Sequence, residues 1–373
     1  MRLNAFLLVA ALLGLCIAER ERHISSSTGG LHCLNESGAP VDWWVVLKYN
    51  LQSGASDAAI EDGYGYAYLD SVNSRHLMTS EGTLKDTDKG AVSLTMKMIQ
   101  AKQSDSDQVG VGYYNDDTPY EGTDSYRAHM KGVVATDSAT ETGLWITHSV
   151  PEYPWILAEG EYEFPDDELV YGQSMMCISL EGSEMDVLGD AFSNDMPNYY
   201  GVSMPSSLSS WAPSLYASMV QDAHTTKAVG TSATIVSRGG DVFTLFSKSK
   251  KWNQNLWEDL VAVTYASDLY VETWGRPLDG PDCKGVDGLV YTVTNVRDVA
   301  VDGYAWSEGQ DHSKWAVSMD SDIVCIGDIN RMSSQMKRGG GAVCMQNSDV
   351  WHAFSEIIVD YDVCGTDTDG MTH

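Results

Sequence analysis

Short apolar runs dominate the chain, and most of them have the composition of β-strands. Runs rich in β-branched and aromatic residues predict strands over Trp43–Lys48, Tyr64–Leu69, Gln108–Tyr114, Gly132–Thr136, Leu144–Val150, Met175–Leu180, Ala233–Val236, Val242–Phe246, Leu289–Val296, Trp315–Met319 and Ile323–Ile326. Apolar residues at intervals of three and four predict helices over Ala91–Ala101, Ser214–Ala223, Leu256–Ala266 and Val350–Val359. Because the predicted strands and helices alternate, the pattern favours an α/β architecture.

One local pattern occurs twice. In HMKGVVATD (129–137) and HSKWAVSMD (312–320), a strand that carries His-x-Lys runs to an aspartate. Each chain segment then makes a short polar turn and returns as an apolar strand. This duplicated strand–turn–strand unit predicts two homologous halves, residues 19–205 and 206–373, packed as a single-chain pseudo-dimer.

The repeated His-x-Lys pair has a definite chemical use. Side chains at positions i and i+2 of a strand point to the same face, so His129 projects with Lys131 and His312 with Lys314. A neutral imidazole can attack phosphorus and a protonated one can donate to a leaving oxygen, while an ammonium binds phosphoryl oxygens. A single such pair is usually a surface feature. Two copies with aspartate at the same offset favour a catalytic site for phosphoryl transfer that needs no metal ion.

The N-terminus and the cysteines indicate the secretory pathway. Residues 1–18 combine one basic residue, a short apolar run and small residues, which predicts a signal peptide, and no later run is long enough to span a membrane. The six cysteines that remain after Cys16 predict three disulfides of open connectivity. Asn35 begins an Asn-Glu-Ser sequon and is a predicted glycosylation site. With no CxxC or HExxH motif, we expect no metal and no cofactor.

The net charge of −30 argues against a polyanionic ligand, because such a surface repels polyanions. It is typical of a protein that stays soluble and stable in an acidic or salty fluid. A nucleic-acid substrate therefore requires a local positive patch. Lys131 and Lys314 would form its centre, and Arg127, Lys337 and Arg338 lie close to the two motifs in sequence.

The two motifs resemble the HxKx4D and GxxN signature of the phospholipase D superfamily, with one extra residue between lysine and aspartate. A closer resemblance, to the deoxyribonuclease II family, extends over nearly the whole mature chain. It is carried by SGAPVDWWVVLK (37–48), GYAYLDS (65–71), AHMKGV (128–133), THSVPEYP (147–154), YGQSMMCIS (171–179), DHSKWAVS (311–318), CIGDINR (325–331) and KRGGGAVC (337–344).

The resemblance implies a phospholipase D-like fold of two α-β-α halves and metal-independent endonucleolytic cleavage of DNA at acidic pH. The products would carry 3′-phosphate and 5′-hydroxyl ends, and contact would be to backbone phosphates with little sequence preference. The protein would be lysosomal or extracellular. The implied disulfides are Cys33–Cys177, Cys283–Cys364 and Cys325–Cys344.

Residue roles follow from the same resemblance. His129 and His312 would be the catalytic pair and Lys131 and Lys314 the phosphate-binding groups. By analogy with phospholipase D enzymes, His129 is the expected nucleophile, forming a phosphohistidine, and His312 the general acid; the sequence leaves the reverse assignment open. The expected supporting residues are His148, Asp328 and Asn330.

Two other functions fit the sequence. One is a different phosphodiesterase of the phospholipase D superfamily, acting on phospholipid or on single-stranded nucleic acid. The other is a secreted toxin or binding protein of the same fold. The sequence does not show whether two chains associate as a homodimer.

Overall fold

The computed structural model describes residues 30–364. The predicted signal segment, residues 1–18, lies outside the described residues. No helix in the part of the chain that is described is long and apolar enough to cross a membrane.

The first half of the chain forms an eight-stranded sheet in the order β12-β6-β9-β10-β11-β3-β4-β5. Its strands are β3 (Trp43–Lys48), β4 (Tyr66–Asp70), β5 (Met78–Thr79), β6 (Val109–Asn115), β9 (Lys131–Asp137), β10 (Thr142–His148), β11 (Gln173–Glu181) and β12 (Tyr199–Ser203). Two small ribbons, β1 (Cys33–Leu34) with β2 (Pro40–Val41) and β7 (Asp117–Thr118) with β8 (Gly122–Thr123), lie outside it.

The second half forms a nine-stranded sheet in the order β13-β14-β20-β19-β18-β15-β16-β17, with β21 also paired to β16. Its strands are β13 (Gly230–Val236), β14 (Val242–Lys248), β15 (Leu269–Glu272), β16 (Val293–Val301), β17 (Tyr304–Ser307), β18 (Trp315–Ser318), β19 (Ile323–Gly327), β20 (Gly340–Gln346) and β21 (Ile358–Tyr361). In both sheets the strand that follows His-x-Lys turns directly into its antiparallel neighbour, as β9–β10 and β18–β19.

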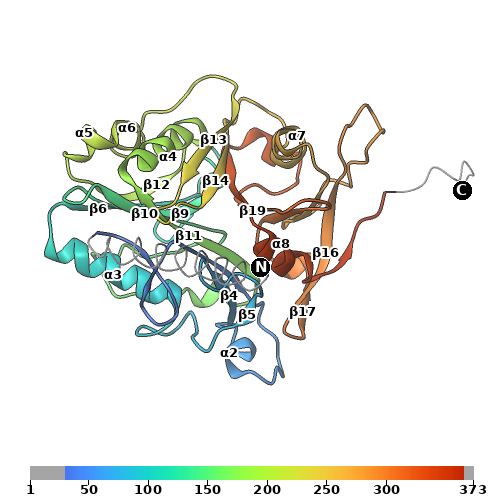
Figure 1. Cartoon of the computed structure of the whole chain (residues 1–373), viewed down its shortest axis with the longest axis horizontal. Coiled ribbons are helices and arrows are strands. Elements are labelled where there is room, and N and C mark those ends of the chain that lie inside the picture. The colour runs from blue at the N-terminus through green and yellow to red at the C-terminus, as the bar shows by residue number, and fades with distance from the viewer. Residues whose placement is uncertain (1–29, 365–373) are drawn as a thin grey trace, which may run out of the picture.

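The helices lie outside and between the sheets (Figure 1). They are α2 (Ala58–Glu61), α3 (Ala91–Asp105), α4 (Gly182–Asp195), α5 (Leu208–Trp211), α6 (Pro213–Gln221), α7 (Ala262–Tyr265) and α8 (Ser348–Ser355), with single turns at η1 (Asp166–Glu168), η2 (Trp257–Val261), η3 (Glu308–Gln310) and η4 (Gln335–Lys337). Local signals start two of them. Pro213 opens α6, and the Asn347 side chain accepts from the first N–H groups of α8.

Both faces of each sheet are covered, which explains strands without polar alternation. In β3, the side chains of Trp43 and Val45 enter a central core shared with the second sheet, while Trp44 and Val46 face an outer core beneath α3. Successive residues of the second sheet also face opposite cores: Leu245 joins the central core, whereas its neighbour Phe246 packs with the residues around α7. The order of layers is therefore helix, sheet, central core, sheet, helix.

The expected fold class was wrong. Among residues 30–364, strands hold 33% of the residues and helices 22%, and the large sheets are antiparallel rather than the sheets of α-β-α halves in a phospholipase D-like pseudo-dimer. Among the named strand pairs of residues 30–364, only β15 with β16 is parallel. Connection length accounts for part of the difference. Short turns join β9 to β10, β13 to β14, β16 to β17 and β18 to β19 as antiparallel hairpins, whereas parallel pairing needs a long crossover. Other antiparallel pairs, such as β3 with β11 and β14 with β20, join strands that are far apart in sequence.

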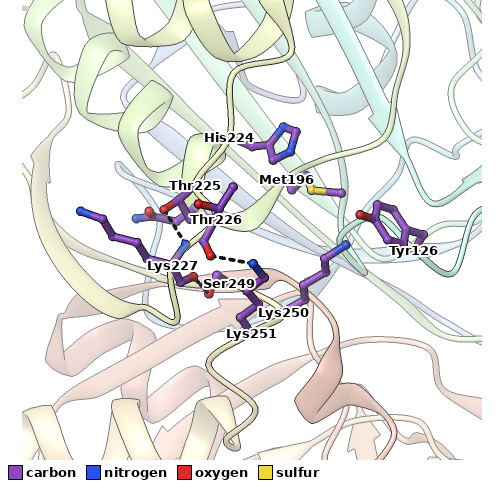
Figure 2. Close-up of a pocket in the computed structure, with 10 residues that line it drawn as sticks. Tyr126, Met196, His224, Thr225, Thr226, Lys227, Ser249, Lys250 and Lys251 are labelled. Atoms are coloured by element: carbon purple, nitrogen blue, oxygen red, sulfur yellow. Dashed lines mark hydrogen bonds between the residues drawn. The ribbon is translucent and has the colours of Figure 1, made fainter.

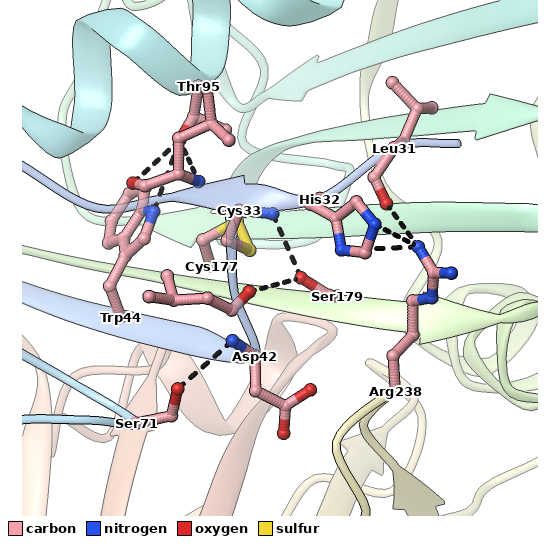
Figure 3. The surroundings of a disulfide bond; sticks show 12 residues. Leu31, His32, Cys33, Asp42, Trp44, Ser71, Thr95, Cys177, Ser179 and Arg238 are labelled. Atoms are coloured by element: carbon pink, nitrogen blue, oxygen red, sulfur yellow. Dashed lines mark hydrogen bonds between the residues drawn. A yellow bond between two sulfur atoms is a disulfide. The ribbon is translucent and has the colours of Figure 1, made fainter. Parts of the chain in front are cut away.

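Three disulfides join the six described cysteines as Cys33–Cys177, Cys283–Cys364 and Cys325–Cys344, the pairing that the resemblance implies. The first lies close to a contact between the halves (Figure 3). There the buried Asp42 carboxylate accepts from the Ser237 hydroxyl and the Gly239 N–H, and Arg238 donates to the Leu31 carbonyl at 3.2 Å. Asp42 is thus a structural residue that fastens the first half to the loop between β13 and β14.

Candidate active site

Matching ends of the two sheets supply the predicted site residues. In the first sheet, antiparallel register places Lys131, at the start of β9, opposite His148, at the end of β10. In the second sheet, Lys314 directly precedes β18, and its backbone carbonyl accepts from the Gly327 N–H at 2.8 Å. Asp328 follows at the end of β19. Antiparallel pairing therefore gathers residues that are far apart in sequence at one end of each sheet.

Lys131 is held by a buried ion pair. Its ammonium contacts the carboxylate of Asp116, which follows the end of β6, and both side chains are buried. Arg338 from the second half also binds Asp116, at 2.9 Å. Burial alone would raise the pKa of Asp116, but Lys131 and His129 outweigh it and hold that pKa below its usual range. Asp116 therefore stays ionised and joins the two halves.

His129 is oriented by backbone groups of the second half. The backbone N–H of His129 donates to the Gly339 carbonyl at 2.9 Å. Its ring Nδ1 lies 2.7 Å from the carbonyl oxygen of Asp328. A carbonyl can only accept, so Nδ1 carries a proton and the lone pair of the neutral ring is on Nε2. Burial lowers the pKa of His129 to about 3, with Asp116 opposing and Lys131 reinforcing that shift.

His312 is oriented by the first half in turn. The backbone N–H of His312 donates to the Gly172 carbonyl at 2.8 Å, and its ring stacks on Tyr171 with centroids 4.0 Å apart. Its Nδ1 lies 4.0 Å from a carboxylate oxygen of Glu168. Burial, followed by Lys314 and Lys131, lowers the pKa of the ring to about 3. Burial likewise raises the pKa of Glu168 to about 7.

Lys314 lies across the junction. Its N–H donates to the Ser174 hydroxyl of β11 at 3.1 Å, and its ammonium donates to the His312 carbonyl at 2.7 Å. The side chain is buried, and burial together with Lys131 lowers its pKa to about 7. Lys314 is therefore charged mainly below neutral pH.

The two His-x-Lys pairs form one electrostatic unit. The charge of Lys131 acts on the pKa of His312, and the charge of Lys314 acts on the pKa of His129. The charge of Lys131 also lowers the pKa of Lys314. Coulomb interactions of this kind require short separations, because water and salt screen longer ones. The structure thus brings the four residues together at the junction of the sheets.

The supporting residues occupy distinct places. His148 is buried against Tyr153, with ring centroids 5.2 Å apart, and burial, then Lys131, lowers its pKa to about 3. Asp328 accepts from the Thr147 hydroxyl at 3.4 Å, and burial raises its pKa to about 7. Asn330 is buried, and its side-chain oxygen has no partner among residues 30–364. Of the three, Asp328 contacts His129 through its carbonyl and His148 pairs with Lys131 in the sheet.

Other residues near the motifs have structural roles. Asp137 caps a turn by accepting from Ala139 N at 2.9 Å, and Asp320 accepts from Ser267 at 3.1 Å. Arg127 forms an ion pair with Asp222 at 2.7 Å. No group of three or more His, Cys, Asp or Glu side chains within residues 30–364 is placed to hold a metal ion.

Two buried lysines were missed in the sequence. Lys48 ends β3, and its ammonium donates to the carbonyls of Tyr49, Leu169 and Tyr171 at 2.7–2.9 Å. Lys248 ends β14 and donates to the carbonyls of Gln335, Met336 and Arg338. The loop that Lys48 binds contacts His312 through Tyr171, and the loop that Lys248 binds contacts His129 through Gly339. A lysine at the end of an otherwise apolar strand, in WWVVLK and in VFTLFSK, was the available signal.

Comparisons with known proteins identify the family of this chain. The family model described as Deoxyribonuclease II matches residues 32–364. The chain is 35% identical over 341 residues to Plancitoxin-1 of Acanthaster planci, covering 89% of this chain and 92% of that one. It is 31% identical to Deoxyribonuclease-2-alpha of Rattus norvegicus (88% and 93% covered) and 31% identical to Deoxyribonuclease-2 of Caenorhabditis elegans (90% and 94% covered). This chain therefore belongs to the deoxyribonuclease II family.

Proposed function

We propose that this protein is an acid endodeoxyribonuclease that hydrolyses DNA phosphodiester bonds without a metal ion, leaving 3′-phosphate and 5′-hydroxyl ends. Family membership supports the reaction class. The observation that carries the proposal is the meeting of both His-x-Lys pairs in one cluster, with each histidine oriented by the other half of the chain. One phosphodiester can then be held between a nucleophile and an acid.

His129 is the proposed nucleophile, because its Nδ1 contact to the Asp328 carbonyl leaves the lone pair on Nε2. Nε2 forms a bond to phosphorus, the P–O5′ bond breaks, and the departing O5′ takes a proton from His312. Water then gives a proton to His312 and attacks phosphorus. The N–P bond breaks, His129 regains its lone pair, and the 3′-phosphate is released.

The charge of the site supports an acidic working pH. Near pH 5 Lys314 is cationic, because its lowered pKa is still about 7, and burial raises the pKa values of Glu168 and Asp328 to about 7, so both carboxyl groups are largely neutral. Above pH 7 these carboxylates ionise, while Lys314, whose pKa burial lowers to about 7, loses its charge. A phosphodiester anion is therefore bound more tightly at pH 5 than at pH 8.

The same anion supplies the proton that His312 needs. In the free protein the ring is neutral at pH 5, because burial and Lys314 lower its pKa to about 3. A bound phosphate places a negative charge beside the ring and favours the protonated form. Binding and protonation are thereby coupled, and His129, hydrogen-bonded to a carbonyl, remains the free base.

Cellular placement belongs to the same proposal. Three disulfides fit an oxidising compartment, and a signal peptide at residues 1–18 would direct the chain to a lysosome or to the extracellular fluid. Asn35, which is only partly buried, is the proposed glycosylation site. The division into halves at 205/206 is also proposed, since the first sheet ends at Ser203 and the second begins at Gly230.

Plasmid digestion at pH 5 in EDTA, followed by analysis of fragment ends, tests the proposal. We expect cleavage with 3′-phosphate and 5′-hydroxyl ends, and none of phosphatidylcholine under the same conditions. Loss of cleavage in EDTA, or ends of the opposite polarity, would contradict it.

A further inference from the structure

A small pocket beside the proposed active site carries a concentration of positive charge (Figure 2). Its volume is about 80 Å³, and its lining includes Tyr126, His224, Lys227, Lys250 and Lys251. No aspartate or glutamate lines it, although 53 of the 373 residues of the chain are acidic. The pocket is therefore a place where this acidic protein attracts an anion.

Contacts to backbone carbonyls hold the pocket together, and two lysine side chains lie at its lining. The Ser249 hydroxyl donates to the Lys227 carbonyl at 2.8 Å, and the Lys251 ammonium donates to the Thr226 carbonyl at 2.8 Å. The Lys250 ammonium is buried against the Tyr126 ring, 2.9 Å from its centroid, and no hydrogen-bond acceptor is recorded for it among residues 30–364, so the side chain must turn outward to meet a phosphate. An ammonium with three N–H donors and no acceptor is suited to a phosphate.

The pocket is directly connected to His129. Tyr126 precedes the histidine by three residues, and three Cα–Cα steps span at most about 11 Å. The backbone carbonyl of Met196, a residue that lines the pocket, accepts from the Ala128 N–H at 3.0 Å. The Arg338 side chain donates to the Arg127 carbonyl at 2.8 Å. One short segment thus borders both the pocket and the catalytic cluster.

We propose that this pocket is a second DNA-binding subsite, which holds a backbone phosphate about three nucleotides from the bond that is cut, since a strand rises about 3.4 Å per nucleotide. Lys250 and Lys251 bind the phosphate. Tyr126, which is 67% exposed, stacks on a base of the same strand. This inference rests on the proposed nuclease function and adds an extended contact to it.

The charge part of the subsite is tested with a K250Q/K251Q double variant. On plasmid DNA we expect KM to rise on the order of tenfold and the slope of log KM against log salt to fall by about 1–2, because each lysine releases about one counterion. Thymidine 3′-(p-nitrophenyl phosphate) is too short to reach the pocket, so its rate should be unchanged. The matched control is K97Q/K102Q on α3, which removes the same charge from the other side of the first sheet.

The stacking part is tested by binding of fluorescent oligonucleotides to a His312→Ala background, where cleavage does not interfere. An abasic site at the third nucleotide should weaken binding about fivefold or more, and Tyr126→Ala should abolish that difference. Equal salt slopes for K250Q/K251Q and the control would overturn the subsite. If the unmodified protein cleaved neither substrate, the proposed function would fail instead, while the binding data would still decide the subsite.

Discussion

The two histidines occupy matching positions but have different surroundings. Each one receives its backbone acceptor from the other half, Gly339 for His129 and Gly172 for His312. The ring of His129 then contacts a carbonyl, that of Asp328, whereas the ring of His312 lies near the carboxyl group of Glu168. The fold therefore repeats the backbone contacts of the two histidines and varies the groups around their rings.

This difference explains how two equal residues can take unequal roles. A carbonyl fixes the tautomer of His129 and leaves its Nε2 lone pair available for attack. His312 instead stacks on Tyr171 with Glu168 nearby, and because burial and Lys314 lower its pKa to about 3, it is the proposed bound phosphate that favours a proton on it. The nucleophile is thus defined by a rigid acceptor, and the acid by a titratable neighbour.

Removal of either histidine has the largest expected effect. His129→Ala and His312→Ala should each lower kcat on DNA by about 10²–10⁴-fold, because each removes a group in contact with the reacting phosphate. A good leaving group separates them: on thymidine 3′-(p-nitrophenyl phosphate), His312→Ala should recover much of its activity and His129→Ala should not. The exposed His76, paired with Glu356, is the control position. Equal recovery of both variants would remove the proposed asymmetry.

The buried lysines come next. Lys48→Met and Lys248→Met each leave three loop carbonyls without a donor, and the shifted loops should lower kcat about 10- to 100-fold with little change in KM. Because the Lys48 loop contacts His312, Lys48→Met should lose less on the nitrophenyl substrate than Lys248→Met does. Lys97→Met on α3 is the control. Thermal melts establish that the variants are folded; identical losses on both substrates would argue against positioning.

Glu168→Gln should have a smaller effect that depends on pH. Burial raises the pKa of Glu168 to about 7, so the group is neutral at pH 5 and the variant should stay within about threefold of the unmodified protein there. Above pH 7 the variant lacks a negative charge, and its activity should decline less steeply. The pH profile of kcat/KM between 4.5 and 8 measures this. An inactive variant at pH 5 would show that His312 needs the carboxylate.

The smallest expected effect is on the pH dependence of thermal stability, to which the buried carboxyl groups and the buried histidines contribute with opposite sign. Seven carboxyl groups have raised pKa values, so their contribution to stability is present at low pH and is lost as pH rises through those values: Asp42, Glu168, Asp195, Glu258, Glu272, Asp311 and Asp328. Three histidines with lowered pKa values act oppositely below their usual pKa: His129, His148 and His312. The carboxyl groups outnumber them, so Tm should be about 5 °C higher at pH 5 than at pH 7. A higher Tm at pH 7 would show that the histidines dominate.

Local patterns predicted single elements well. The strand over Trp43–Lys48 has the predicted bounds, and the helix at Ala91 starts where its periodicity begins. Two other elements were not predicted, because they contain glycine. α4 (Gly182–Asp195) contains Gly189, and β20 (Gly340–Gln346) begins within a glycine run. In both cases the glycines allow close packing, as at Gly189 against the backbone of Leu215.

The sequence pointed to candidate site residues through its repeated motif and through the family resemblance, which added His148, Asp328 and Asn330. His-x-Lys occurs twice and drew attention to four residues. Asp116, Glu168, Lys48 and Lys248 come from strand ends and loops with no shared motif, and only sheet register and the packing of the halves bring them to the histidines. The antiparallel topology was likewise hidden, because the strand pattern does not record which strands pair.

The most direct test is to locate the covalent intermediate. The His312→Ala variant is mixed at pH 5 with thymidine 3′-(p-nitrophenyl phosphate), quenched in alkali, digested and mapped by mass spectrometry. The account predicts a thymidine 3′-phosphoryl adduct on His129, which accumulates because His312 is absent from the hydrolysis step. An adduct on another residue, or nitrophenol release with direct transfer to water and no adduct, would contradict it.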